Sequence, residues 1–292
     1  MPKAGNTWTR DEHILEFNLY SQLPFGKMHK GTPQIIELAR LLGRTDSSVA
    51  FKLSNFARLD PALQERGIRG MQHGAKGEEE VWREFYAHPE ELAFESEGLL
   101  AKRLYKPVEE VAEIDVKDLP PEGKEREAIV RVRVNQNFFR RRIISAFEFR
   151  CCVTGLAVRD LLVASHIVPW ARAYFSRSFL KSAKRGTRAV VCSRSAAEFS
   201  TEIGSKDPVH RLNPRNGLCL NALHGRAFDR GMMWVDNGFV IRFSDRLHAA
   251  ARKQEEPTLQ WLTGFEGKPL YLPKRFAPDP ELLQRHASTC AG

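Results

Sequence analysis

One stretch of this chain, Cys152–Asp229, constrains the fold more than any other because it links four short motifs in a fixed order. It opens with Cys-Val-Thr-Gly at 152–155 and continues with Ala-Ser-His-Ile-Val-Pro-Trp at 164–170. After a long interval come Arg-Leu-Asn-Pro-Arg-Asn-Gly-Leu-Cys-Leu at 211–220, then His224 and the pair Phe228-Asp229. The order is therefore a histidine in an extended segment, an asparagine in the approach to a helix, and a histidine on that helix.

This His–Asn–His order resembles the HNH endonuclease family, and the resemblance covers roughly residues 129–243. It implies an α+β fold of the ββα-metal type, in which a hairpin and a helix hold one divalent metal ion against a phosphodiester. The resemblance gives His166 the role of general base and Asn216 the role of orienting the base and its loop. It makes His224 the leading metal ligand, with Asp229 as a second ligand or as an acceptor for a ligating imidazole.

The chemistry explains why so few side chains are needed. A neutral imidazole can take a proton from water at physiological pH. A divalent cation, Mg²⁺ or Mn²⁺ at one per active site, can neutralise the phosphate and stabilise the leaving oxygen. A carboxamide such as that of Asn216 donates and accepts hydrogen bonds without adding charge, although the Asn-Pro-Arg-Asn-Gly run is also rich in turn formers.

Two positions depart from the family pattern. Many relatives carry aspartate directly before the base, where this chain has Ser165, and others carry Asp or His directly after the helix histidine, where this chain has Gly225. These departures leave the metal ligand set open and keep a second reading in view, a DNA-binding protein with an inactive nuclease domain. Cys152 and Cys219 lack the partners that a bracing zinc would need, so we expect no structural zinc.

The first part of the chain reads as a helical domain, residues 1–88. Thr9-Arg-Asp-Glu12 has the form of a capping box, Thr32-Pro33 begins a second helix and Gly43 ends it. A new helix start follows within four residues, which is the outline of a helix-turn-helix. The face of the second helix is expected to contact DNA or, alternatively, to be the solvated polar face of a small helical bundle. Its candidate contacts are Arg44, Ser48, Lys52 and Asn55.

Residues 89–128 read as an acidic, proline-interrupted linker with some helix between Glu90 and Leu104. A nuclease domain is expected over 129–292. Alternation of Val130, Val132 and Val134 with arginines predicts a strand at its start. Further strands are expected at 161–167, 232–235 and 239–243. A helix is expected from about Leu218 to Arg230, and a short one near 281–286.

The net charge of +9 points to an anionic partner, and basic residues gather around the HNH motifs. We expect DNA contacts from Arg140 and Arg141, on a helix beginning after Asn135, and from Arg172. A long basic insertion at 174–208 interleaves arginine and lysine with phenylalanine, which suits a nucleic-acid clamp or, alternatively, a mobile surface loop. Its candidate contacts are Arg177, Lys181 and Arg185.

The sequence therefore predicts a metal-dependent endonuclease acting on double-stranded DNA, with a restriction or defence role and possible sensitivity to modified bases. A one-metal site nicks one strand, so a homodimer is expected. No run approaches eighteen apolar residues, and the start lacks an apolar signal core, which favours a cytoplasmic protein without membrane segments. A nuclease that acts on RNA is the third reading. It ranks below DNA cleavage because a helix-turn-helix suits the major groove of B-form DNA better than A-form RNA.

Overall fold

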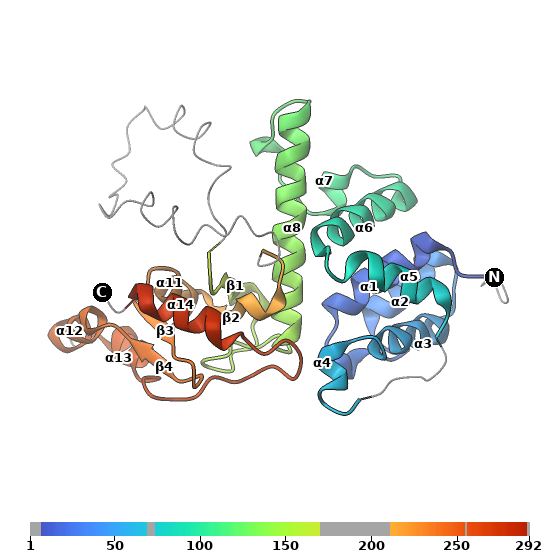
Figure 1. Ribbon diagram of the computed structural model, residues 1–292. Coiled ribbons are helices and arrows are strands. Elements are labelled where there is room, and N and C mark those ends of the chain that lie inside the picture. The colour runs from blue at the N-terminus through green and yellow to red at the C-terminus, as the bar shows by residue number, and fades with distance from the viewer. Residues whose placement is uncertain (1–6, 69–73, 170–210, 255, 291–292) are drawn as a thin grey trace.

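The computed structural model describes residues 7–68, 74–169, 211–254 and 256–290. A long helix, α8 (Lys124–Ala146), stands between a group of helices from the first part of the chain and a smaller α+β unit from the last part (Figure 1). The chain is therefore helix-rich with small antiparallel sheets, and the expected α+β class, with a helical region before the nuclease motifs, is confirmed.

The helical region follows the expected starts. Thr9 caps α1 in a capping box with Glu12, whose carboxylate accepts from the Thr9 backbone N–H at 2.9 Å. Pro33 begins α2, and Gly43 ends it in the left-handed conformation with φ 66°. The helices are α1 (Arg10–Gln22), α2 (Pro33–Leu42), α3 (Asp46–Ala57), α4 (Pro61–Gln64), α5 (Lys76–Phe85), α6 (Pro89–Leu104) and α7 (Val108–Val111), with 3₁₀ turns η1 (Phe25–Lys27) and η2 (Val116–Asp118).

Helix α3 does not present the expected polar face. Helix α5 packs across it, and the carboxylate of Glu78 accepts from Lys52 Nζ at 2.5 Å and from Asn55 Nδ2 at 3.0 Å. Asn55 is only 1% exposed, and Arg44 is paired with Glu12 at 2.9 Å. The expectation that this helix exposes Lys52 and Asn55 is therefore wrong, because a buried carboxylate from a later helix needs both groups. Ser48 is partly exposed and donates to the Thr45 carbonyl.

The strand expected at Val130–Val134 is also wrong, because these residues lie within α8. Val130 and Val134 are four residues apart, so they share one helical face with Phe138, and all three are buried. Over five residues, the alternation of valine with arginine is compatible with the two-residue period of a strand and with the 3.6-residue period of a helix. The segment is a helix because the apolar stripe continues at the helical spacing along the next twelve residues.

Part of the expected linker is a packed helix. Helix α6 lies against α1 and α8 (Figure 1), and its Leu92 and Ala93 are 2% and 1% exposed. Of the acidic residues that suggested a connector, Glu91 is exposed, whereas Glu97 is 1% exposed and pairs with Arg141 of α8. The boundaries of the expected domains, 1–88, 89–128 and 129–292, stay a prediction.

The HNH motifs fold as a hairpin followed by a helix. Strand β1 (Leu162–His166) pairs antiparallel with β2 (Gly217–Asn221), so that His166 lies opposite Gly217. Helix α11 (Ala222–Asp229) follows directly, and α8 and α11 both pack on the two strands. The helix expected from Leu218 therefore begins only at Ala222. All five residues of β2 are buried, and Leu218–Leu220 are apolar. A short, continuously buried run of this kind does not distinguish a strand from a helix by its period.

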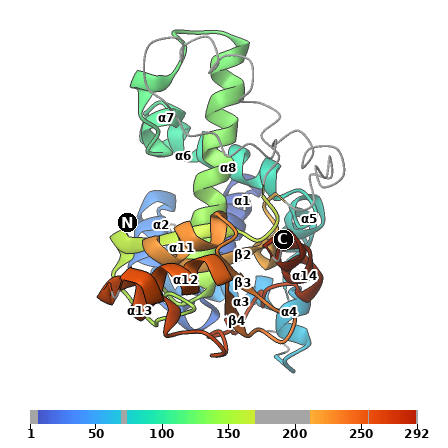
Figure 2. The ribbon, with the colours of Figure 1, turned by 90° about the vertical axis from the view of Figure 1, so that its left-hand side faces the viewer.

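The remaining elements complete the unit (Figure 2). Strands β3 (Met233–Val235) and β4 (Ile241–Phe243) form a second antiparallel pair, close to the two strands expected there. Helices α12 (Asp245–Gln254), α13 (Pro257–Thr263) and α14 (Pro280–Cys290) follow, and 3₁₀ turns lie at η3 (Arg159–Leu161) and η5 (Pro214–Asn216). The short helix expected near 281–286 lies within α14.

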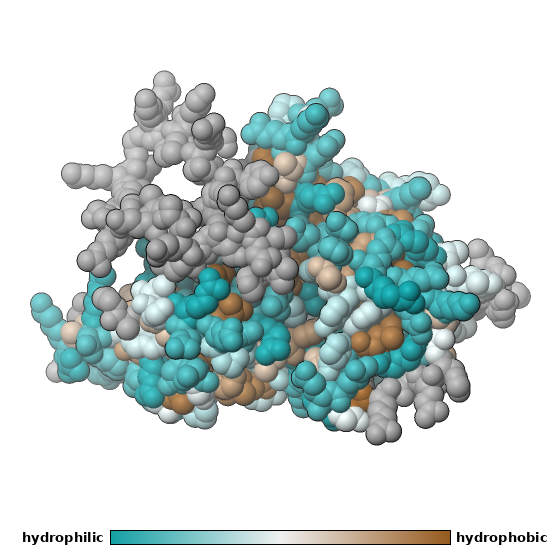
Figure 3. Space-filling view, in the orientation of Figure 1, coloured by the Kyte–Doolittle hydropathy of each residue, from teal (hydrophilic) through white to brown (hydrophobic). Residues whose placement is uncertain are grey.

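The face drawn in Figure 3 is mainly hydrophilic, with apolar side chains scattered over it rather than gathered in one broad patch. Among the described residues, no helix combines the length and the apolar character that crossing a membrane requires.

Candidate active site

His166 is the last residue of β1, and contacts from two described residues, Phe139 and Arg211, help to fix its ring. The imidazole stacks on Phe139 of α8, with ring centroids 3.8 Å apart and planes 7° from parallel. Its Nε2 lies 3.0 Å from the backbone carbonyl oxygen of Arg211. A carbonyl only accepts, so Nε2 carries the proton and the lone pair belongs to Nδ1.

The electrostatics of His166 keep it neutral at physiological pH. Burial lowers its pKa below the ordinary value of 6.5, and the hydrogen bond to the Arg211 carbonyl opposes that shift. A neutral ring with a defined tautomer is the state that a general base needs before it accepts a proton.

Asn216 closes the end of the hairpin beside this histidine. It is 1% exposed, and its Oδ1 accepts from the Val168 backbone N–H at 2.8 Å while its Nδ2 donates to the Val168 carbonyl at 3.2 Å. Its own backbone carbonyl accepts from Ile167 N–H at 3.0 Å. The side chain thus holds the chain where β1 ends, two residues after His166, which is the geometry that a positioning role requires.

Asn221 is a site residue that the sequence reading did not single out. It caps α11, since its Oδ1 accepts from the backbone N–H groups of Leu223 at 3.1 Å and His224 at 3.0 Å. Its Nδ2 therefore faces His224 Nδ1, 2.8 Å away, and donates to it. An asparagine directly before a helix is a recognisable N-cap signal, although nothing in that signal indicates the bond to the histidine.

His224, the leading candidate ligand, is turned away from the hairpin end. It is fully buried, and the rings of Trp261 and Phe265 meet it edge-on at centroid distances of 5.2 and 5.3 Å. Because Nδ1 accepts from Asn221, the ring's proton is on Nε2. Nε2 has no hydrogen-bond partner within the described part of the chain. The nearby backbone of Leu262 acts in the direction of a higher pKa for the ring, but this effect is smaller than that of burial.

Burial lowers the pKa of His224 to about 4. Nδ1 already accepts a hydrogen bond from Asn221 and Nε2 carries the proton, so neither nitrogen offers an accessible lone pair to a metal ion. This geometry does not fit the role of metal ligand expected for His224.

The face of α11 that meets β1 carries Gly225 and Asp229 instead. A Cβ on Gly225 would lie 2.4 Å from a methyl of Val163 and 3.4 Å from Ser165 Oγ, so glycine lets the helix approach the strand closely. Asp229, one turn further on, is exposed at the edge of this seam. Partial burial raises the pKa of its carboxyl, while a hydrogen bond from Ser165 and the charge of Arg226 oppose the shift.

The described side chains fit a divalent metal ion only in part. In the portion of the chain that the structure describes, no three His, Cys, Asp or Glu side chains converge on one point. Asp229 is the only one of the two expected ligands with an accessible donor, and Mg²⁺ is often held by one or two carboxylates, waters and substrate phosphate. The described residues therefore supply one fitting ligand and not a complete protein cage.

The basic residues around the HNH motifs that were expected to touch DNA fall into two groups. On α8, Arg140 Nη2 donates to the Leu162 carbonyl at 2.7 Å, and Arg141 is ion-paired with Glu97 and 43% exposed. Arg140 therefore places positive charge beside the start of β1, whereas the charge of Arg141 is paired with a carboxylate of α6. The other expected contacts, Arg172, Arg177, Lys181 and Arg185 in and before the insertion 174–208, lie outside the described residues.

A hairpin that ends in an oriented neutral histidine, an asparagine clamped across its end and a helix packed on both strands define a ββα nuclease domain. In agreement, the family model described as HNH endonuclease matches residues 151–236, and this segment belongs to the HNH endonuclease family. No curated protein and no solved structure was found to match the chain.

Proposed function

We propose that the protein is an endonuclease that hydrolyses phosphodiester bonds in double-stranded DNA, with His166 as the general base. The observation that carries the proposal is the fixed tautomer of His166, set by the Arg211 carbonyl on one side and the stacked ring of Phe139 on one face. The family of residues 151–236 supports the class of reaction.

In this mechanism Nδ1 of His166 takes a proton from the water that attacks phosphorus. The imidazolium that results is stabilised by the same Nε2–H bond to the Arg211 carbonyl, since hydrogen bonding to the charged form favours it. Phe139 restricts rotation of the ring, and Asn216 keeps the backbone after the base in place. The proton transfer therefore begins from a prearranged ring rather than from a mobile one.

The proposal includes one divalent metal ion per site, Mg²⁺ or Mn²⁺, with Asp229 as the ligand from the described residues. Such an ion supplies charge neutralisation at the phosphate and at the leaving oxygen. Since one such site cuts one strand, we further propose a homodimer for double-strand cleavage. A cytoplasmic restriction or defence role, with possible sensitivity to base modification, follows as the biological proposal.

A second function is favoured by a specific observation. His224 is sealed among aromatic rings, and Ser165 and Gly225 stand where relatives carry metal ligands. A DNA-binding protein with an inactive nuclease domain would show the same features. The intact surroundings of His166 and Asn216 favour the active enzyme.

The test is cleavage of supercoiled plasmid, modified and unmodified, by wild type, His166→Ala and the matched control His29→Ala. His29 is an exposed histidine of the helical region. We expect nicking by wild type and control in Mg²⁺ or Mn²⁺, none in EDTA, and at least a hundredfold loss in His166→Ala, as about 10²–10⁴-fold is typical for a general base. Metal-dependent cutting that survives His166→Ala would remove the proposed base. DNA binding without cutting in any condition would establish the second function.

A further inference from the structure

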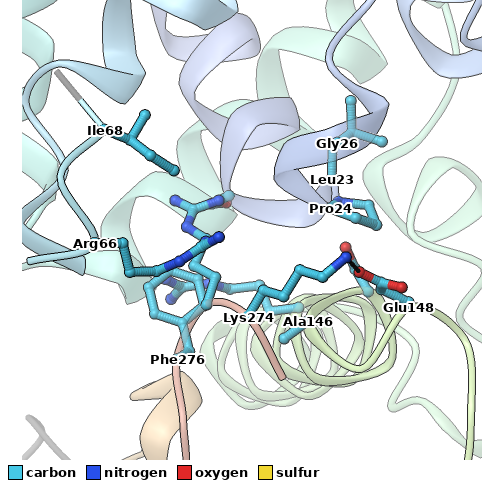
Figure 4. A pocket seen from close by; sticks show the side chains of 13 residues that line it. Leu23, Pro24, Gly26, Arg66, Ile68, Ala146, Glu148, Lys274 and Phe276 are labelled. Carbon is cyan, nitrogen blue, oxygen red and sulfur yellow. Dashed lines mark ion pairs between the residues drawn. The ribbon is translucent and has the colours of Figure 1, made fainter. Parts of the chain in front are cut away.

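A cavity of about 280 Å³ lies away from the nuclease hairpin, where three parts of the chain meet. Lining residues between positions 21 and 26 and at 66 and 68 come from the helical region. Others, between 142 and 148, come from the end of α8 and the turn after it, and residues 274–276 come from the segment before α14. In Figure 4, Lys274 extends toward Glu148 on one side of the cavity, and Arg66 and Phe276 lie on the other.

The lining is strongly cationic. Four basic side chains line it, namely Arg66, Arg142, Lys274 and Arg275. Lys274 is paired with Glu148 at 3.1 Å, and Arg275 with Asp60 at 2.7 Å. Among the described residues, Arg66 and Arg142 have no carboxylate within ion-pair distance, so two positive charges are left without a counter-charge.

Arg142 is the less compensated of the two inner arginines. Its Nη1 donates to the Leu212 carbonyl at 3.0 Å, while its Nε is buried without a hydrogen-bond partner among the described residues. Burial lowers the pKa of Arg142 to about 9, and the neighbouring charge of Arg275 adds to the shift, while Asp60 and Tyr86 oppose it. A buried guanidinium next to a second one is costly unless an anion joins them.

Arg275 is held rigidly beside it. Its side chain is 7% exposed, Nη1 donates to the Tyr20 carbonyl at 3.1 Å, and its Nε is likewise without a partner in the described part of the chain. Arg275 and Arg142 both lie over the ring of Phe276, at 4.3 and 5.4 Å from its centroid. The backbone of Phe276 has φ 61°, a region that such a residue enters only where its surroundings hold it.

We propose that this cavity is a binding site for the terminal phosphate of a nucleotide. Guanidinium groups bind phosphate oxygens with charge-assisted, forked hydrogen bonds, and a phosphomonoester brings the two negative charges that the lining lacks. The cavity equals about nine water volumes at ~30 Å³ each, more than a bare phosphate needs. Its apolar part, Phe276 with Pro24 and Ile68, suits the organic portion of the ligand.

Two sources supply this chemistry, a free nucleotide and the 5′-phosphate at a DNA end. A phosphodiester within a strand carries one charge and continues in both directions, so it satisfies the lining less well than a terminal phosphate does. The site is separate from the proposed active site and does not depend on cleavage.

Binding is measured by calorimetry on the full-length chain carrying His166→Ala, in EDTA, so that no oligonucleotide is cut and failure of the nuclease proposal leaves the result intact. The probes are inorganic phosphate, deoxyadenosine monophosphate, deoxyadenosine, and one short oligonucleotide with a 5′-phosphate or a 5′-hydroxyl. We expect the monophosphate to bind and deoxyadenosine not to bind. Tighter binding of the 5′-phosphorylated oligonucleotide than of the monophosphate assigns the site to DNA ends, and the reverse order assigns it to free nucleotides.

Two variants test the arginines: Arg66→Gln changes an exposed side chain, and Arg142→Lys keeps the charge but removes the forked guanidinium. Each is expected to weaken binding of the monophosphate by about tenfold or more, since a hydrogen bond to a charged group contributes ~1.5–3 kcal/mol. Arg246→Gln, an exposed arginine on α12, is the control and should bind as the parent does. Absence of binding by every phosphate probe would overturn the site. Binding that is unchanged in both Arg66→Gln and Arg142→Lys would overturn it as well.

Discussion

Replacing Asn216 by alanine tests whether the clamp at the hairpin end is what holds the proposed base in place. The substitution removes the acceptor for Val168 N–H and the donor for the Val168 carbonyl, which are 2.8 and 3.2 Å from the Asn216 side chain. Val168 is 6% exposed, so both backbone groups lose their partner in a largely buried setting. A buried polar group left unsatisfied costs about 1–3 kcal/mol.

The sum for two groups is about 2–6 kcal/mol, and a water molecule entering the vacated space would bring it toward the lower end. The Ile167 N–H bond to the Asn216 carbonyl remains, so β1 should still pair with β2. We expect the loss to be local, with faster hydrogen exchange at the Val168 amide and a fall in plasmid nicking that exceeds the fall in folded protein.

The assay combines urea unfolding, amide exchange and nicking for wild type, Asn216→Ala and Asn213→Ala. Asn213 is the matched control, because its side chain caps the adjacent 3₁₀ turn by accepting from Arg215 N–H at 2.9 Å and does not touch Val168. A free energy of unfolding within 0.5 kcal/mol of wild type (about the spread of surface substitutions), together with unchanged exchange at Val168, would refute the reasoning.

Three further predictions concern the same unit. Gly225→Ala places a methyl 2.4 Å from Val163, and overpacking of this kind should lower the free energy of unfolding by about 1–3 kcal/mol; a stabilised variant in urea unfolding would show that the seam is looser than the structure has it. Burial lowers the pKa of His224 to about 4, below its ordinary 6.5, so the unfolded chain binds that proton first and stability is lost as pH falls from 6.5 toward 4. His224→Phe should therefore reduce the slope of the free energy of unfolding against pH by up to about 1.4 kcal/mol per pH unit. An unchanged slope between pH 7 and 5 would contradict the burial argument. Phe139→Leu removes the ring stacked on His166, so nicking should fall while the hairpin persists, and an NMR titration should give a different His166 pKa; equal titration curves would mean that stacking does not set the ring's environment.

Features with a local chemical cause were predictable from the sequence. The capping box at Thr9, the glycine that ends α2 and the strand that ends at His166 each depend on residues within a few positions of one another. Asn216 was predictable as a site residue from the HNH resemblance, and its contact to Val168 is the part that only the structure gives.

Features that depend on a distant partner were not predictable. Lys52 and Asn55 look like exposed contacts until Glu78, from a helix more than twenty positions later, is found buried against them. Likewise the buried run of β2 is compatible with a helix or a strand by its pattern alone. It is a strand because it pairs with β1 and is covered by α8 and α11. The position of His224 on α11 was predictable in sequence but not its direction, because a helix turns by about 100° per residue and Gly225 occupies the side that faces the strand.

The hydrogen bonds described above at His166 and at the end of β1 share one property, which is that each of them ends on a backbone atom. His166 bonds to the carbonyl of Arg211, and the Asn216 side chain bonds to the N–H and carbonyl of Val168. Outside the proposed active site, Arg142 bonds in the same way to the carbonyl of Leu212, the next residue along the chain. Every amino acid presents the same carbonyl, so the identity of residue 211 is of little consequence for the geometry of the base. The length of the segment 211–216 is of great consequence, since one inserted or deleted residue would offset the carbonyls from both His166 and Arg142 at once. Position 211 should therefore tolerate substitution far better than the segment 211–216 tolerates insertion or deletion.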